Sequence, residues 1–134
     1  MNGKSRMNRT MLRSKVHRIA VTGCDVEYEG SLTLDRMLMD AADMVPYEKI
    51  DVYDVDNGNR FSTYLIEGEP GNGECCVNGA AARLVELGDK LIIASYAEVA
   101  ADDLSDYRPT VVLIGAGNHI KHVKEDEAAG VRVN

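Results

Sequence analysis

Strand-like segments follow one another at short intervals along this chain, and this spacing most limits how it can fold. Apolar or alternating segments recur roughly every 8–15 residues, with turn residues rather than long helical patterns between them. A parallel sheet of the βαβ type needs about a dozen or more residues, usually a helix, between two paired strands. The spacing therefore favours a mainly β fold, and specifically a small closed barrel with short helices.

The expected strands lie at residues 16–22, 31–34, 50–55, 60–66, 74–77, 90–99 and 110–114. Asn57-Gly58 supplies the positive φ angles of a type I′ turn, so it predicts a hairpin between the third and fourth of these strands. Two short helical segments are expected. One covers residues 35–44 with Asp35 as its N-cap, and the other covers residues 78–85 with Asn78 as its N-cap.

The chain has 134 residues and is most simply one domain. We expect a flexible basic N-terminal extension at residues 1–10, the barrel domain at residues 11–115 and a polar C-terminal tail at residues 116–134. No apolar run approaches the roughly 20 residues needed to span a membrane, and the N-terminus lacks the apolar stretch of a secretory signal. The expected location is the cytoplasm, with no membrane partner.

Charge is unevenly distributed along the sequence. The first 18 residues hold six basic side chains and no acidic one, while all 22 acidic side chains follow them. The net charge is −7, and a negatively charged body argues against binding the phosphate backbone of a nucleic acid. The basic start is more simply explained by pairing with acidic surface or by service to a local site than by contact with nucleic acid.

The cysteines and histidines do not form a recognisable ligand set. Cys24, Cys75 and Cys76 are odd in number and show no CxxC spacing, so buried free thiols in a reducing compartment fit better than disulfides or zinc. His119 and His122 lack a second pair of ligands, and no metal is expected. Cys75 and Cys76 would either pack inertly, which is favoured, or make a nearby site sensitive to oxidation.

Tyr28-Glu29-Gly30-Ser31 has the composition of a segment that can cleave itself. Glycine has no side chain to block approach to its carbonyl and tolerates strained backbone geometry. The hydroxyl of Ser31 can reach the Gly30 carbonyl carbon through a five-membered ring. By itself Gly-Ser is common, and an ordinary turn is the alternative interpretation.

Several fragments, taken in order, resemble the pyruvoyl-dependent aspartate 1-decarboxylase family. They are Met11-Leu-Arg-Ser-Lys15-Val-His17-Arg18, Tyr28-Glu-Gly30-Ser31, Asp40-Ala-Ala, Asn57-Gly58-Asn-Arg60-Phe-Ser-Thr63-Tyr64, Val77-Asn78-Gly79-Ala80-Ala81-Ala82 and Gly88-Asp89-Lys-Leu-Ile-Ile-Ala-Ser. The resemblance covers roughly residues 7–115. It implies a closed six-stranded double-psi β-barrel that assembles as a homotetramer, in agreement with the barrel that the strand spacing favours.

The resemblance also implies a chemistry. Decarboxylation of an amino acid leaves an electron pair on Cα, which a ketone joined to the amine as a Schiff base can accept, and no standard side chain carries a ketone. Ser31 Oγ would attack the Gly30 carbonyl, the peptide would become an ester, and elimination followed by hydrolysis would turn residue 31 into a pyruvoyl group. The products would be residues 1–30 and residues 31–134, the second starting with this covalent cofactor. Spontaneous cleavage and cleavage assisted by a maturation factor both stay open.

Two neighbouring residues are matched to steps of this chemistry. Thr63 would donate a hydrogen bond to the oxyanion formed at Gly30, and Tyr64 would be the proton donor to the carbanion. In a regular strand the two side chains point to opposite faces. Either the strand bends there, or the two residues serve the sites of different subunits. An ordinary strand residue is the alternative interpretation of Thr63.

Substrate binding is assigned by the same resemblance. Arg60 carries a planar fork suited to a carboxylate, and Lys15 would add a second cation. The remaining assigned positions are Thr63, Asn78, Gly79, Ala80 and Ala81 for substrate binding, with His17, Tyr28, Tyr53 and Ile92 in supporting places. Tyr53 stands where a Trp is often found in the family, which leaves the pocket width open. Each of three residues also has an ordinary structural interpretation. Arg60 would be a solvated surface charge, Lys15 would form an ion pair on the surface, and Asn78 would be only a helix N-cap.

The expected function is therefore that of a self-processing lyase, made as a zymogen, which converts L-aspartate to β-alanine and CO₂. By resemblance it feeds pantothenate and coenzyme A synthesis. One alternative is the same chemistry on glutamate, since one methylene changes discrimination by only about 10–200-fold. Another is a non-catalytic barrel module that binds a partner or a nucleic acid through the basic N-terminus.

Overall fold

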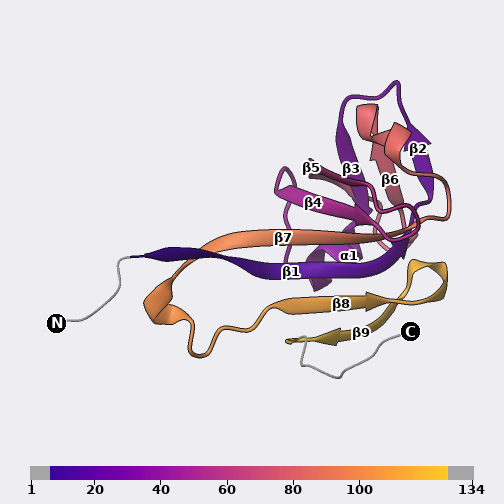
Figure 1. The fold of residues 1–134 in the computed structure, drawn as a ribbon. Helices are drawn as coiled ribbons and strands as arrows, with labels where there is room; N and C mark the ends of the chain where they lie inside the picture. The colour runs from indigo at the N-terminus through magenta and orange to yellow at the C-terminus, as the bar shows by residue number, and fades with distance from the viewer. Residues whose placement is uncertain (1–6, 127–134) are drawn as a thin grey trace.

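The strands of the chain join into one continuous hydrogen-bonded sheet (Figure 1). The structure is a computed structural model that describes residues 7–126. Its elements are β1 (Asn8–Ala20), β2 (Gly23–Asp25), β3 (Ser31–Asp35), α1 (Arg36–Ala41), β4 (Lys49–Asp54), β5 (Arg60–Gly68), β6 (Cys75–Asn78), η1 (Gly79–Leu84), β7 (Lys90–Ala100), η2 (Ala101–Asp103), β8 (Thr110–Ile114), η3 (Ala116–Asn118) and β9 (Ile120–Lys124). The expectation of a mainly β protein with short helices is confirmed.

Within the described residues the sheet has nine strands in the order β2-β6-β3-β5-β4-β7-β1-β8-β9. The short strands β2 and β9 lie at its two edges and add two strands to the seven expected from the sequence. Hydrogen bonds do not join these two edges, so curvature rather than a closed ladder gives the sheet its shape, which is consistent with a small β-barrel. In Figure 1 the long pair β1–β7 runs across the middle, with β8 and β9 below it, and β2, β3 and β6 rise above one end of it.

Three strand pairs are parallel, although the chain has no crossover helix of ordinary length among the residues described. They are β1 with β8, β2 with β6, and β3 with β5. Parallel neighbours need a connection long enough to return the chain to its starting side. Here other strands serve as the connection, since the chain passes through α1 and β4 between β3 and β5. The sequence has no room for crossover helices, and this excludes a βαβ sheet. It does not exclude parallel pairing of strands.

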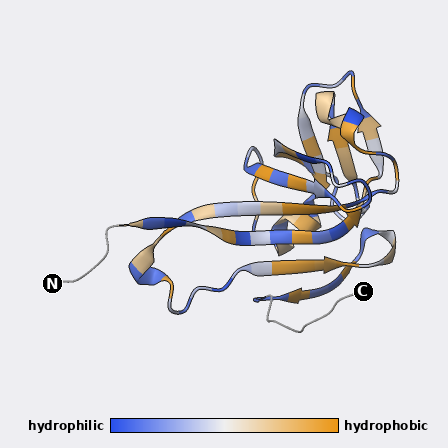
Figure 2. Ribbon diagram, viewed as in Figure 1, coloured by the Kyte–Doolittle hydropathy of each residue, from blue (hydrophilic) through white to orange (hydrophobic). Residues whose placement is uncertain are grey.

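The sheet formed by β1, β7, β4 and β5 has two unlike faces. Val16, Ile93 and Val52 are opposite one another in successive strand pairs, and all three are fully buried. Residues directly opposite in an antiparallel pair share a face, so this row belongs to the core side. The neighbouring positions in each strand must then face the other way. Figure 2 shows the resulting alternation along β1, and the nearly continuous apolar colour of β8.

The hairpin between β4 and β5 is confirmed, but its turn is not the expected type I′. Of Asn57 and Gly58, only Gly58 has a positive φ, at 81°. The loop spans residues 55–59, and the Gly58 amide donates to the Asp54 carbonyl over 2.9 Å. The Asp54 carboxylate accepts the amides of Asp56 and Asn57 at 2.8 and 3.3 Å. The Asp54 side chain thus stabilises a longer loop than the two-residue turn expected from Asn-Gly alone.

The helix after β3 is confirmed and is shorter than expected. Asp35 is its N-cap, and its carboxylate accepts the Met37 amide at 2.8 Å. The same buried carboxylate accepts the amides of Gly71 and Gly73 at 2.9 and 2.7 Å. One side chain therefore holds both the start of α1 and the loop before β6.

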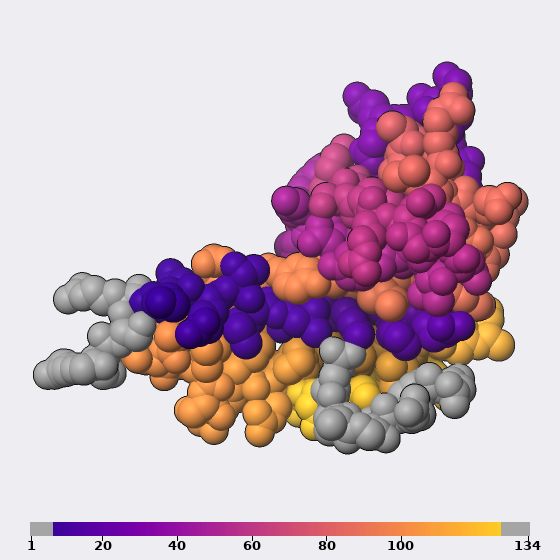
Figure 3. Space-filling view, viewed as in Figure 1, coloured from indigo at the N-terminus to yellow at the C-terminus, as the bar shows by residue number. Residues whose placement is uncertain are grey.

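At both ends of the described chain, some residues that were expected to lie in an extension or a tail form paired strands. β1 begins at Asn8, inside the range expected for the basic extension, and pairs with the end of β7. β9 lies within the expected polar tail and pairs with β8. Residues 1–6 and 127–134 of those two predicted segments lie outside the described residues. The start of β1 and the end of β7, which are paired, project together from the rest of the molecule (Figures 1 and 3).

No helix among residues 7–126 has both the length and the apolar character that a membrane crossing requires.

A half-buried ion pair joins β1 to the start of β4. Arg13 Nη2 donates to Glu48 Oε2 over 2.6 Å, and Ser95 Oγ donates to the same oxygen. The Val45 amide donates to the other carboxylate oxygen at 3.1 Å. Burial by itself raises the pKa of Glu48, but these three donors outweigh it and lower the pKa of the carboxyl below its usual range.

We expect Glu48→Gln to reduce the free energy of unfolding by about 1–3 kcal/mol at pH 7, because it leaves the half-buried Arg13 and Ser95 without their charged acceptor. A carboxyl with a lowered folded pKa stabilises the fold above its unfolded pKa and loses this contribution as the pH falls through the folded pKa. The difference between wild type and variant should therefore shrink on acidification. Urea denaturation from pH 7 down to pH 3 would measure it.

The matched control is Glu67→Gln, which breaks the pair between Arg36 and Glu67, two side chains that are 45% and 47% exposed. Solvent screens an exposed pair, so this variant should unfold close to the wild type at every pH. Equal losses in the two variants would contradict the role given to Glu48.

Candidate active site

The Gly30–Ser31 peptide lies where a loop enters β3, and the Ser31 side chain is buried. Ser31 is 1% exposed and is opposite Asn78 in the antiparallel pair of β3 and β6. Asn78 Nδ2 donates to Ser31 Oγ over 2.9 Å and to Thr33 Oγ1 over 3.1 Å. The hydroxyl at the predicted cleavage point therefore has a fixed neighbour and no access to bulk water.

This contact corrects the prediction that Asn78 caps the following helix. Asn78 is the residue before η1, a 3-10 helix, but its side chain makes no capping bond. The side-chain amide of Asn78 already donates to two hydroxyl groups on the neighbouring strand β3, so it points toward the sheet rather than toward η1.

Gly79 touches the backbone of the predicted cleavage point. Its φ is 75°, and a Cβ placed on it would lie 2.7 Å from Gly30 Cα and 3.2 Å from the Tyr28 carbonyl oxygen. No side chain fits in that space, and non-glycine residues rarely adopt this φ. The first turn of η1 is thus pressed against the Gly30 peptide. We call Tyr28, Gly30, Ser31, Asn78 and Gly79 the processing cluster.

A second group of predicted residues shares the face of the sheet opposite the core. Arg60 is opposite Tyr53, Tyr53 is opposite Ile92, and Ile92 is opposite His17. Lys15 lies two residues before His17 on β1 and so points to the same side. We call Lys15, His17, Tyr53, Arg60 and Ile92 the outer sheet face.

Aromatic contacts fix the charged end of this face. The Arg60 guanidinium lies over the Tyr53 ring, 4.6 Å from its centroid, a cation–π arrangement. The Tyr53 hydroxyl lies 2.9 Å from that of Tyr96, and this hydrogen bond, with burial, raises the pKa of Tyr96 to about 12. Tyr96 is therefore neutral at physiological pH and adds no negative charge beside Arg60.

Thr63 and Tyr64 lie on β5 between these two groups. Arg60, Ser62 and Tyr64 are exposed while Thr63 is half-buried, which is the alternation expected of a regular strand. Tyr64 is 39% exposed, and its ring centroid is 6.4 Å from that of Tyr47. Because Leu32 is opposite Leu65 in the parallel pair of β3 and β5, continuing that register would set Tyr64 beside Ser31 and Thr63 beside Gly30.

Within one chain the outer sheet face and the processing cluster are separate. Arg60 lies four residues before Tyr64 on β5, which corresponds to roughly 13 Å of extended chain. Its guanidinium is held over Tyr53, at the hairpin end of the strand. Of the two alanines after Gly79, Ala80 is exposed and Ala81 is half-buried. A cavity of about 600 Å³ is lined by His17 together with Arg18, Lys90 and other residues that belong to neither group.

The cysteines are free thiols, and only one of them is fully buried. Cys75 is buried, and this burial raises its pKa above the ordinary value, which keeps the thiol neutral and unreactive. Cys76 Sγ lies 3.4 Å from Asn78 Oδ1, so it contacts the processing cluster. The expectation that all three are buried is wrong for Cys24, which is exposed because β2 is an edge strand.

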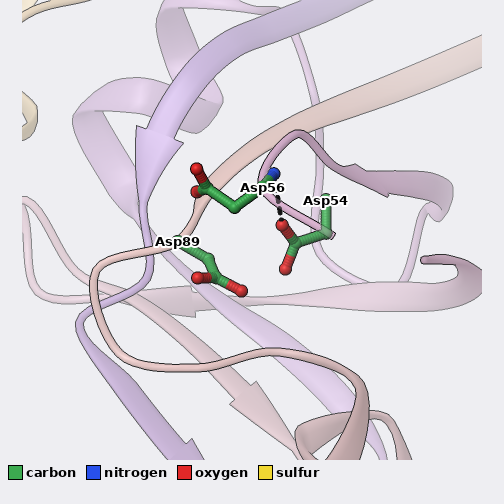
Figure 4. A group of neighbouring side chains, drawn as sticks. All are labelled: Asp54, Asp56 and Asp89. Carbon is green, nitrogen blue, oxygen red and sulfur yellow. Dashed lines mark hydrogen bonds between the residues drawn. The ribbon is translucent and has the colours of Figure 1, made fainter. Parts of the chain in front are cut away.

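One cluster of side chains was not predicted from the sequence. Carboxylate oxygens of Asp54, Asp56 and Asp89 lie within 4.8 Å of one another (Figure 4). Burial, and next a contact with Asp89, raises the pKa of Asp54 to about 6. The available signal was the pair of acids flanking Val55 in the turn, but nothing local to that turn indicates Asp89 as a third member.

Comparison with known proteins identifies the family of this chain. The family model described as aspartate decarboxylase matches residues 7–121. The aspartate 1-decarboxylase of Ralstonia nicotianae is 54% identical over 118 residues, which cover 88% of this chain and 98% of that protein. The Ralstonia pickettii enzyme of the same name is 55% identical over 119 residues, covering 89% and 99%. That of a Sulfurihydrogenibium species is 55% identical over 128 residues, covering 95% and 96%. This chain belongs to the aspartate decarboxylase family.

Proposed function

We propose that this chain is a lyase that cleaves itself between Gly30 and Ser31 and then converts L-aspartate to β-alanine and CO₂, a step that supplies pantothenate synthesis. Membership of the family supports the reaction. The observation that best supports self-cleavage is that the Gly30–Ser31 peptide has a close neighbour on each of its two residues. Asn78 holds the Ser31 hydroxyl, and Gly79 contacts the Gly30 backbone.

The proposed self-cleavage uses atoms of the chain and one water molecule. Ser31 Oγ adds to the Gly30 carbonyl carbon, the C–N bond breaks, and an ester with a free amine on residue 31 results. Elimination then releases Gly30 as a carboxylate. Hydrolysis of the remaining enamine releases ammonia and leaves a pyruvoyl group at residue 31. The carbonyl of that group supplies the electron sink that no encoded side chain offers.

The processing cluster is suited to the first of these steps. Asn78 Nδ2 fixes the position of Ser31 Oγ, which replaces a freely rotating nucleophile with an oriented one. Thr63 is proposed as the donor to the oxyanion at Gly30, in keeping with the continued register of β3 and β5. Tyr64, on the other face of β5, is proposed as the proton donor that acts after CO₂ leaves.

Substrate binding is proposed for the outer sheet face. Arg60 presents a planar fork to one carboxylate of aspartate, and Lys15 adds a second positive charge on the same face. Asn78 and the backbone amides of Gly79, Ala80 and Ala81 would hold the substrate beside residue 31. Tyr53 and Ile92 would form the pocket wall, with His17 and Tyr28 supporting it.

We propose that these two parts of the site meet between copies of the chain in a homotetramer. Arg60 is too far along β5 to reach Ser31 in its own chain, whereas the outer sheet face of a second copy can approach it. The projecting pair of β1 and β7 offers exposed strand surface for such an assembly (Figure 3).

Three free cysteines suit a reducing compartment such as the cytoplasm.

Self-cleavage is tested by denaturing mass spectrometry of the purified chain. The wild type should give residues 1–30 and a larger fragment lighter than residues 31–134 by one ammonia. Ser31→Ala should stay as one full-length chain and lose decarboxylase activity by more than about a thousandfold, because both nucleophile and cofactor precursor are gone. Ser105→Ala, at an exposed position, is the control and should cleave normally.

An uncleaved, fully active wild type would reject the proposal. Cleavage of chain purified after refolding from denaturant, with no other protein present, would show that maturation is spontaneous. Cleavage only after adding cell extract would assign it to an accessory factor.

Gly79→Ala should slow self-cleavage by more than about tenfold. The added Cβ would lie 2.7 Å from Gly30 Cα, so the scissile peptide must shift relative to Ser31 Oγ. The rate is measured by gel electrophoresis of freshly refolded protein. Gly58→Ala is the matched control, since Gly58 also has a positive φ but has no atom near its Cβ position. Both variants carry the same backbone strain, so an equal effect would mean that strain alone is responsible.

Arg60→Lys should raise KM for L-aspartate by roughly ten- to a hundredfold while self-cleavage proceeds normally, because a point charge replaces the bidentate fork and the contact with Tyr53 weakens. Steady-state release of CO₂ from cleaved enzyme measures this, with L-glutamate as the competing substrate. Unchanged KM in Arg60→Lys would remove Arg60 from the substrate site, and a higher kcat/KM on glutamate would replace aspartate as the substrate.

A further inference from the structure

Three aspartates meet at a place that the proposed reaction does not use. Asp54 ends β4, Asp56 lies in the turn that follows, and Asp89 lies in the turn before β7. Each offers a carboxylate oxygen within 4.8 Å of the other two. Figure 4 shows the Asp54 and Asp89 carboxylates facing each other, with the Asp56 side chain beside them and its carboxylate directed away from the space between them in this view.

Each carboxylate is held in place through one of its two oxygens. Asp54 Oδ1 accepts the amides of Asp56 and Asn57, and Asp56 Oδ2 accepts the Lys90 amide at 2.8 Å. Asp89 Oδ2 accepts the Glu86 amide at 3.0 Å. Backbone donors therefore fix the orientation of all three groups and leave a second oxygen on each, the arrangement usual for carboxylates that bind a metal.

The second oxygen of Asp54 has no partner although it is inaccessible to water. Asp54 is 2% exposed, and its Oδ2 is a buried atom without a hydrogen bond. Burying an ionised carboxylate is unfavourable unless it is paired or coordinates a metal. Among residues 7–126, no Lys or Arg side chain forms an ion pair with any of these three aspartates. The three carboxylates thus have no positively charged neighbour among these side chains, although their free oxygens leave a place where a cation could bind.

We propose that Asp54, Asp56 and Asp89 bind one hard divalent cation, with Ca²⁺ preferred. All three ligands are carboxylate oxygens, which suit Ca²⁺ and Mg²⁺ rather than the softer metals bound by Cys and His. Oxygens on opposite sides of Ca²⁺ lie up to about 5 Å apart, compared with about 4 Å around Mg²⁺. Mg²⁺ demands near-ideal octahedral geometry and is usually bound by one or two carboxylates, so a set of three carboxylates already oriented by backbone amides fits Ca²⁺ better. Water and backbone carbonyls would complete the coordination.

The bound ion would fasten two turns that come from distant parts of the sequence. Asp54 and Asp56 belong to the β4–β5 turn, and Asn57 Nδ2 and Asn59 Nδ2 of the same turn donate to the Leu84 carbonyl at 3.0 and 2.9 Å. Asp89 lies just after that carbonyl, at the end of the segment from η1 to β7. The cation site would therefore stabilise the hairpin that carries Tyr53 and Arg60.

The test is direct titration of the complete protein after treatment with EDTA and dialysis at pH 7.5. Isothermal titration with CaCl₂ should give one site per chain, and saturating CaCl₂ should raise Tm by roughly 5 °C. MgCl₂ should bind at least tenfold more weakly. Absence of binding heat together with an unchanged Tm for both cations would overturn the proposal. It would also be the result expected if Asp54 and Asp89 instead share a proton.

Variants locate the site. Asp54→Asn and Asp89→Asn should each abolish the calcium-dependent rise in Tm, while Asp106→Asn, an exposed aspartate outside the cluster, should keep it. Asp56 is exposed, whereas Asp54 is buried and Asp89 is half-buried, so Asp56→Asn is expected to fold even if the other two variants do not, and it should weaken calcium binding by about tenfold. Calcium affinity unchanged in Asp56→Asn and in either folded variant at Asp54 or Asp89 would place the bound ion elsewhere and reject this site.

Discussion

The contact between Gly79 and the Gly30 backbone is the constraint on which the proposed site depends. It requires a left-handed φ and the absence of a side chain at one position, and it holds only while β6 pairs with β3 in the observed register. In a strand, a shift by one residue turns every side chain to the opposite face. Such a shift would remove Asn78 from Ser31 and replace it with an apolar neighbour, so register and reactivity are fixed together.

The two-faced sheet explains why the site residues separate into two groups. Alternation along β1, β4 and β7 sends Val16, Val52 and Ile93 into the core, and it necessarily leaves the residues between them on the outer sheet face. Ser31, by contrast, is buried on β3 against β6. A chain that folds around one aliphatic core cannot bring both groups together by itself. The proposed assembly of several copies would bring the two groups together without any change in the fold of each copy.

Features set by nearby residues could be predicted from the sequence, and features set by distant ones could not. Asp35 was identified as an N-cap because its partner, the Met37 amide, lies two residues away. Asn78 was given the same role, but its partner is Ser31, which only the pairing of β3 with β6 brings close. The hairpin after Asp54 was predicted from Asn-Gly, whereas its loop type depends on the Asp54 carboxylate. Asp89 joins that carboxylate only in the folded chain.

The charge distribution along the chain acquires a meaning once the sheet is known. A protein of net charge −7 repels a dicarboxylate at long range, but such repulsion is largely screened beyond about 8–10 Å at physiological ionic strength. The charges nearest the ligand then decide its binding. Lys15 and Arg60 come from opposite edges of the four-stranded unit of β1, β7, β4 and β5, yet they share its outer face. The fold therefore sets these two cations on one surface, together with the Asp51 carboxylate, and there local charge rather than net charge would act on an acidic substrate.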